Sequence, residues 1–166
     1  MTTLPALIIG AVLALGGRTL LVRVTLWKLR RDVDAINHGD YGPLLRGYAD
    51  DAVLVFNEGD HRWAGTHRGK ARIERFLQDF TAAGLKGDVT GLSVAGPPWA
   101  LTMMVRFDDR AAGPDGHELY RNRVVMLVRT RWGKIVHHED FYEDTNRILE
   151  FDRRLTELGI EPVGVS

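Results

Sequence analysis

The chain has 166 residues, a length typical of one domain with a short appended segment. Hydrophobic residues make up 45% and charged residues 27% of the chain, a composition that excludes a disordered or collagen-like protein. The 22 basic and 22 acidic residues cancel, which argues against a dedicated nucleic-acid-binding protein, so no nucleic-acid partner is expected. The chain has no cysteine, which excludes disulfides, thiolate metal sites and cysteine nucleophiles.

The first segment of the chain is basic and apolar. Residues 1–31 contain five basic and no acidic side chains. A run of about 20 apolar residues can span a bilayer, and the run here reaches that length if Arg18 extends to the lipid headgroups. We expect residues 1–29 to form an apolar helix that anchors the protein in a membrane through residues 4–24. The basic residues that follow predict a single-pass protein with a cytoplasmic C-terminal domain.

Two alternatives remain open for this segment. A cleaved signal peptide would have basic residues before the apolar run, and positions 2–6 contain none. A helix that packs on the domain or on a second subunit would use an apolar seam with helical spacing. The residues of that seam are Val22, Leu26, Leu29, Val33 and Ile36. The seam predicts that the helix continues into the domain and ends near Gly39.

The rest of the chain is predicted to contain short helices and then consecutive strands. A short helix is expected after Asp40, and a longer helix between Gly69 and Gly84. The expected strands are Ala52–Asn57, Trp63–His67, Val89–Ala95, Ala100–Phe107, Leu119–Thr130 and Ile135–Tyr142. A final helix ends at Gly159. This order predicts an α+β fold, a cone-shaped, curved antiparallel sheet with helices over its concave face, preceded by the N-terminal apolar helix.

Several short strings resemble those of the nuclear transport factor 2 / SnoaL-like superfamily. They are Tyr48–Ala52, Ala64–Lys70, Gly133–Val136 and Glu139–Tyr142. The resemblance implies a cone-shaped domain with an apolar cavity, and commonly a homodimer built on the outer face of the sheet. We accordingly expect the SnoaL-like domain at residues 30–159, followed by a tail at residues 160–166.

Within that superfamily, two further strings are similar to those of limonene epoxide hydrolases. They are Arg106-Phe107-Asp108 and, after Gly133-Lys134-Ile135, Asp140-Phe141-Tyr142. This resemblance implies that Asp108, Arg106 and Asp140 form a carboxylate–arginine–carboxylate bridge across the pocket floor. Asn57 is available to position a water, although Val55 stands where the family has a tyrosine.

The chemistry of these residues suits direct opening of an epoxide. Arg106 and Asp108 are two apart on a strand and therefore share one face. In a low-dielectric site the arginine can bridge two acids whose pKa values are pushed apart. Asp140 would then deprotonate a water, and Asp108 would protonate the opening oxygen. The alternative is that Asp108 is an ordinary exposed acid near a hairpin and that Arg106 pairs across the sheet.

Aromatic residues are expected to surround a small apolar molecule in the pocket. The candidate ligand-binding residues are Phe56, Trp63, Phe76, Phe107 and His138. Strand alternation separates His137 and Glu139 from His138 and Asp140, so no face offers three metal ligands. We therefore expect no metal and no cofactor.

The sequence as a whole predicts a membrane-anchored SnoaL-like domain that hydrolyses small apolar epoxides. Two alternatives stay open. One is a non-catalytic ligand-binding or assembly subunit, with a homodimer or a membrane protein complex as the assembly. The other is a cyclase or isomerase of the same fold.

Overall fold

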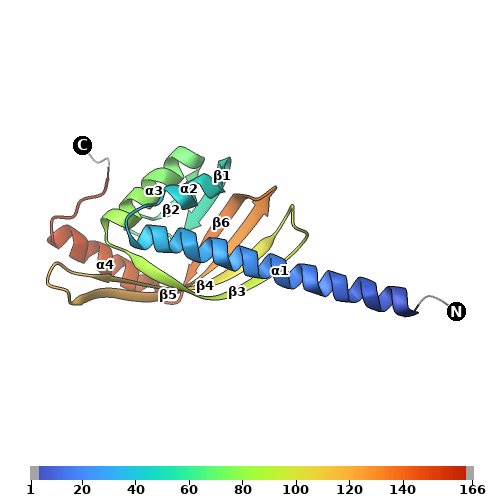
Figure 1. Ribbon diagram of the computed structural model, residues 1–166. Coiled ribbons are helices and arrows are strands. Elements are labelled where there is room, and N and C mark those ends of the chain that lie inside the picture. Colours follow the sequence, from blue (N-terminus) through green and yellow to red (C-terminus); the bar gives the residue numbers. More distant parts are fainter. Residues whose placement is uncertain (1–3, 164–166) are drawn as a thin grey trace.

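The computed structural model describes the backbone of residues 4–163 and the side chains of residues 16–163. Four helices accompany one six-stranded sheet in this part of the chain (Figure 1). The helices are α1 (Leu4–Asn37), α2 (Gly42–Gly47), α3 (Lys70–Ala82) and α4 (Thr145–Glu157). The strands are β1 (Tyr48–Phe56), β2 (Gly65–Arg68), β3 (Lys86–Ala95), β4 (Thr102–Ala112), β5 (Glu118–Arg131) and β6 (Lys134–Tyr142). The predicted α+β fold with a curved sheet is confirmed.

The strand order is β2-β1-β6-β5-β4-β3, and the pairing between β1 and β6 is parallel. The sequence predicted an entirely antiparallel sheet, and this pair is the exception. All other neighbouring strands are antiparallel. Strands β3 to β6 are joined by tight turns, which force antiparallel pairing, whereas β1 and β6 are far apart in the sequence. Apolar alternation carries no information on strand direction, so no local pattern indicated the parallel pairing of β1 with β6.

The helices pack their apolar sides against the sheet. In α3, Ile73, Phe76 and Leu77 are buried with helical spacing. Helix α4 begins at Asp144, whose carboxylate accepts hydrogen bonds from the backbone N–H groups of Asn146 and Arg147. Such a cap satisfies donors that have no partner within the first helical turn. Helix α3 packs against β1, and helix α4 packs against β5.

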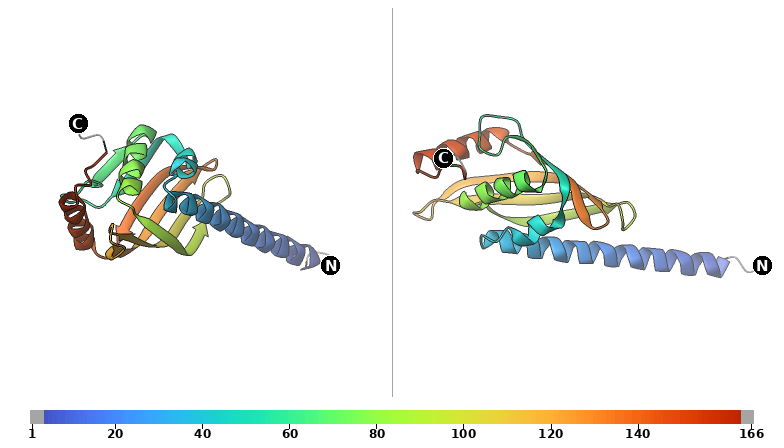
Figure 2. Two further views of the ribbon diagram at one scale, coloured as in Figure 1. Left: turned by 60° about the vertical axis from the view of Figure 1, so that its left-hand side comes forward. Right: turned by 90° about the horizontal axis from the view of Figure 1, so that it is seen from above.

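Helix α1 is continuous over 34 residues and extends well beyond the sheet at its N-terminal end (Figures 1 and 2). It therefore runs through the predicted domain boundary at residue 29 without a break. Its second half packs beside β3, where the Asn37 side chain bonds both the N–H and the carbonyl of Gly87 at 2.8 and 2.9 Å. Ile36 is buried, and Leu26, Leu29 and Val33 pack against the core.

The predicted single-pass membrane location is wrong. Among the described residues, no helix combines the length and the apolar character that crossing a bilayer requires. The uncharged part of α1 ends at Gly17, and five of the next fourteen residues are basic, so the apolar run is shorter than the about 20 residues needed. The side chains of residues 4–15, predicted to contact lipid, lie outside the described residues. So do residues 164–166 of the predicted tail.

Candidate functional site

A small apolar cavity of about 90 Å³ lies between the sheet and helices α1, α2 and α3. Its wall includes Val33 and Ile36 of α1. Most of the other lining side chains are also apolar, and the polar ones are Tyr48, His138, Asp140 and Tyr142. A cavity of about 150 Å³ can hold benzene, so this one accepts only a small molecule unless its walls move.

Three buried polar residues on the cavity wall form a hydrogen-bond relay. His138 and Asp140 are two apart on β6 and share its concave face. The Tyr48 hydroxyl lies 2.6 Å from His138 Nδ1, and His138 Nε2 lies 2.8 Å from Asp140 Oδ1. Burial, with a smaller effect from the charge of Asp140, raises the pKa of Tyr48 far above its usual value. Tyr48 therefore stays protonated, and its hydroxyl donates a hydrogen bond to His138 Nδ1. The other ring nitrogen, Nε2, then carries the imidazole hydrogen and donates a hydrogen bond to Asp140.

A second carboxylate, Asp109 of β4, is buried behind the cavity wall. It is only 1% exposed. Its Oδ2 accepts hydrogen bonds from Tyr142 at 2.9 Å and from Tyr120 at 3.4 Å, whereas its Oδ1 is buried without a partner. Burial raises the pKa of Asp109 to about 7, the charge of Asp140 adds to this, and the tyrosine hydrogen bonds oppose it. The sequence analysis did not single out this residue.

The structure does not bring Arg106 and Asp108 to the cavity. Phe107 and Asp109 are buried on the concave face of β4, so their neighbours Arg106 and Asp108 point to the outer face. The predicted bridge between Arg106, Asp108 and Asp140 is therefore not formed. The alternation of apolar residues at positions 103, 105 and 107 could have shown this, because it places every odd position of the strand inward.

The other predicted site residues divide between the cavity and its surroundings. Phe76, Phe107, His138 and Asp140 line the cavity. Phe56 lies behind it, with its ring 5.1 Å from that of Tyr142.

Trp63 and Asn57 lie elsewhere. Trp63 stacks on Phe151 of α4, with 5.8 Å between the ring centroids. Asn57 follows β1, and its Oδ1 is buried without a hydrogen-bond partner. Neither residue lines the cavity, so the structure does not place Asn57 beside Asp140.

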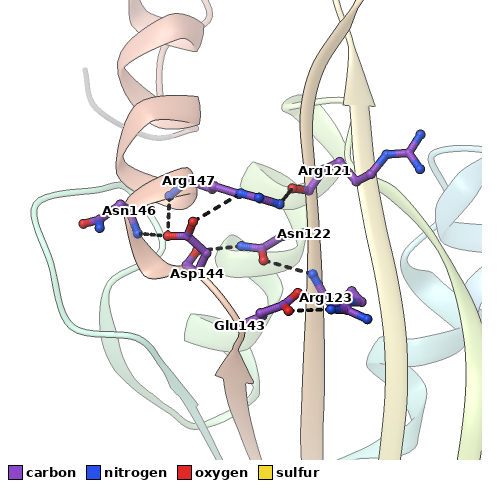
Figure 3. Close-up of polar contacts among 7 residues, drawn as sticks. All are labelled: Arg121, Asn122, Arg123, Glu143, Asp144, Asn146 and Arg147. Atoms are coloured by element: carbon purple, nitrogen blue, oxygen red, sulfur yellow. Dashed lines mark hydrogen bonds and ion pairs between the residues drawn. The ribbon is translucent and has the colours of Figure 1, made fainter.

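A wider groove of about 540 Å³ lies where β6 ends and the chain turns into α4. Figure 3 shows polar contacts among several of its side chains, including two ion pairs. Arg123 pairs with Glu143, and Arg147 pairs with Asp144 at 3.2 Å. The Asn122 amide donates to the Asp144 carbonyl at 2.7 Å. These ion pairs occupy four of the charged side chains of the groove, which Asp108 and Asp109 also line. The apolar cavity, whose wall carries the Tyr48–His138–Asp140 relay, is the stronger candidate for the functional site.

Within residues 16–163, no group of three or more histidine or acidic side chains is placed to hold a metal ion. His137 and Glu139 form a pair 3.3 Å apart on the opposite face of β6 from His138 and Asp140. The separation of the two pairs follows from strand alternation.

A family model for the SnoaL-like domain matches residues 29–138. The chain belongs to the SnoaL-like domain family. No curated protein matches the chain. Solved structures with 18–19% identity share the fold of this SnoaL-like domain.

Three of these structures cover most of the SnoaL-like domain. Bal32a from a soil-derived mobile gene cassette has a TM-score of 0.64 at 19% identity, over 76% of this chain and 94% of its own. An NTF2-like protein from Burkholderia pseudomallei has a TM-score of 0.62 at 18% identity, over 76% and 95%. TerC, co-crystallised with polyporic acid, has a TM-score of 0.58 at 19% identity, over 76% and 95%. At these identities the likeness shows the fold alone.

Proposed function

We propose that this SnoaL-like domain binds a small, mostly apolar molecule in the cavity and moves a proton on it, as a cofactor-independent isomerase or cyclase. The observation that carries the proposal is the Tyr48–His138–Asp140 relay, because it ends in a carboxylate on an otherwise apolar wall. A carboxylate in such surroundings is a suitable general base or acid. The co-crystallisation of the similarly folded TerC with polyporic acid supports a search for a small-molecule ligand.

The proposed step is a proton transfer between carbon atoms. Asp140 takes a proton from a carbon next to a carbonyl group, and the electron pair of the broken C–H bond moves toward the carbonyl oxygen. The carboxylic acid then returns the proton to another carbon, so the substrate is neither oxidised nor reduced. His138 donates a hydrogen bond to Asp140, and Tyr48 fixes the orientation of the imidazole ring.

Epoxide hydrolysis, the activity predicted from the sequence, has less support. It required Arg106 and Asp108 beside Asp140, and both point to the outer face of the sheet. The proposal therefore keeps Asp140 and dispenses with the other two. A non-catalytic ligand-binding domain is the second candidate, and the small cavity volume of about 90 Å³ favours it.

Deuterium exchange tests the proposed proton transfer. The protein is incubated in D₂O with small cyclic ketones, and NMR follows deuterium incorporation next to the carbonyl group. Asp140→Asn should lower the exchange rate by about 100-fold or more, the range typical of a lost general base. Asp108→Asn on the outer face is the matched control and should not change the rate. If the wild type binds a ketone but incorporates no deuterium into it, the result favours a non-catalytic binding domain. If Asp140→Asn leaves the exchange rate unchanged, the role of Asp140 as the base is refuted.

A further inference from the structure

Asp109 does not line the apolar cavity, but it bonds to a residue that does. Its Oδ2 lies 2.9 Å from the hydroxyl of Tyr142, and Tyr142 forms part of the cavity wall. The Oδ1 atom of the same carboxyl group is buried and has no hydrogen-bond partner. A buried carboxylate with an unpartnered oxygen is costly, and protonation removes its charge.

The protonation state of Asp109 decides where the hydroxyl hydrogen of Tyr142 points. An ionised Asp109 can only accept hydrogen bonds, so Tyr142 donates to it and offers a ligand only its oxygen lone pairs. A protonated Asp109 can donate to the Tyr142 oxygen instead. The Tyr142 hydrogen is then free to donate to a molecule in the cavity. One proton thus converts the cavity wall from an acceptor to a donor.

Burial of Asp109 favours its protonated form, while the groups around it act in both directions. From β6, Asp140 adds a like charge, while Tyr142 donates a hydrogen bond that favours the ionised form. From β5, Tyr120 donates a longer hydrogen bond of 3.4 Å to Asp109. The positive charge of Arg147 on α4 opposes the rise in the pKa of Tyr120 that burial causes. The residue opposite Asp109 on β3 is Gly87, which has no side chain. Burial exceeds the other effects, and the pKa of Asp109 rises to about 7.

We propose that Asp109 is a positioning residue that holds a proton and thereby turns Tyr142 into a hydrogen-bond donor toward the cavity, which selects ligands with a carbonyl oxygen. This inference rests on the proposed function, because it requires that the cavity binds a small molecule. Binding of a carbonyl compound is then linked to proton uptake by Asp109. The affinity for a ketone should fall as the pH rises through about 7, whereas that for a hydrocarbon of the same shape should not.

Cyclopentanone and cyclopentane are a matched pair of probes, since they differ only in the carbonyl group. Their dissociation constants are measured by NMR titration between pH 5.5 and pH 8.5, taken as roughly 1.5 units on either side of the Asp109 pKa of about 7. We expect cyclopentanone to bind about tenfold more weakly at the upper limit, which corresponds to one pKa unit of linkage. Cyclopentane should have the same dissociation constant at both pH limits. An equal affinity of cyclopentanone at both pH values would overturn the proposal.

Three variants separate a role for Asp109 from a merely structural one. Asp109→Asn supplies a permanent N–H donor to Tyr142, so it should bind cyclopentanone at every pH as the wild type does in acid. Tyr142→Phe should weaken the binding of cyclopentanone, but not of cyclopentane, and should abolish the pH dependence. Tyr120→Phe, which removes only the longer hydrogen bond to Asp109, should retain the pH dependence of cyclopentanone binding. Persistence of the pH dependence in Asp109→Asn would contradict the role of Asp109.

A measurement on the wild type covers the case in which Asp109→Asn does not fold. The ¹³C resonance of the Asp109 carboxyl group is titrated with each probe present. Cyclopentanone should raise the apparent pKa of Asp109, and cyclopentane should leave it unchanged. Equal titration curves would overturn the proposal even if both probes bind. If neither probe binds at any pH, the proposed function itself fails, and the role of Asp109 fails with it.

Discussion

Gly87 of β3 lies directly against the aromatic ring of Phe107 of β4. A Cβ atom at position 87 would stand 2.3 Å from two ring carbons of Phe107 and 2.8 Å from the Asp108 carbonyl oxygen. The backbone of Gly87 is also held on both sides by the side chain of Asn37 at the end of α1. The close approach holds Phe107 in the cavity wall, and the Asn37 hydrogen bonds join α1 to the sheet.

Gly87→Ala should destabilise the protein by about 1–3 kcal/mol, the usual cost of overpacking. The added methyl group must displace the Phe107 ring, so ligand binding should weaken as well. Urea denaturation followed by circular dichroism measures the first effect. Gly17→Ala in α1 is a suitable control, because nothing lies within 4 Å of its Cβ position. It should be neutral or slightly stabilising, and an equal loss in both variants would argue against the packing explanation.

Tyr48→Phe should remove the hydrogen bond that sets the tautomer of His138. The stability loss should be about 1 kcal/mol, while proton transfer by Asp140 should slow by about tenfold because the imidazole loses its fixed orientation. ¹⁵N NMR of the His138 ring reports the tautomer directly. Tyr41→Phe removes a hydroxyl that accepts from Gln78 at 3.0 Å outside the relay. It should leave the His138 spectrum unchanged, and a tautomer that survives Tyr48→Phe would refute the assignment.

The stability of the fold should decrease between about pH 4 and pH 7 because of Asp109. Its pKa is raised from 3.8 to about 7 by burial, so the folded state favours the protonated acid. Below the unfolded-state pKa both states are protonated and folding incurs no penalty. As the pH rises through the folded-state value, the penalty for burying the charge becomes complete. At about 1.4 kcal/mol per pKa unit, it amounts to a few kcal/mol.

Thermal unfolding at a series of pH values tests this dependence. The Asp109→Asn variant has no titrating group at this position, so its stability profile should be flatter than that of the wild type over the same range. A profile of the variant parallel to that of the wild type would assign the pH dependence to other residues.

Arg62 should contribute far more to stability than the exposed arginines. Its side chain is 1% exposed and pairs with Asp152 of α4, and its Nη2 donates to the Ile160 carbonyl at 2.8 Å. Arg62→Ala leaves the Asp152 carboxylate without this partner and should cost about 3–5 kcal/mol. Arg121, whose pair with Glu118 is exposed, is the control. Its alanine variant should change the stability by at most about 1 kcal/mol, and similar losses in both variants would contradict the argument.

The sequence predicted the fold better than the site. Tight turns such as Trp132-Gly133 and the apolar spacing of α3 are local signals, and they located the strands, the helices and the concave pocket. His138 and Asp140 were also placed correctly on one face of β6. The site failed by one residue on β4, where the resemblance pointed to Asp108 but the alternation of the strand turns Asp109 inward. A shift of one residue reverses the face of every side chain in a strand.

Other features had no signal in the sequence. The parallel pairing of β1 with β6 depends on contacts across about 80 residues, and local patterns do not encode them. The hydrogen bonds of Tyr120 and Tyr142 to Asp109 join three strands, so they emerge only from the assembled sheet. The apolar N-terminal segment gave a strong local signal, but the signal indicated only a helix and did not identify its surroundings.

The continuity of α1 couples two distant parts of the molecule mechanically. Val33 and Ile36 near its C-terminal end line the cavity, while its opposite end reaches past the sheet (Figure 1). Because α1 is unbroken, a ligand that displaced Val33 or Ile36 would also shift the outer turns of the helix. A displacement of the outer turns would in the same way change the cavity wall.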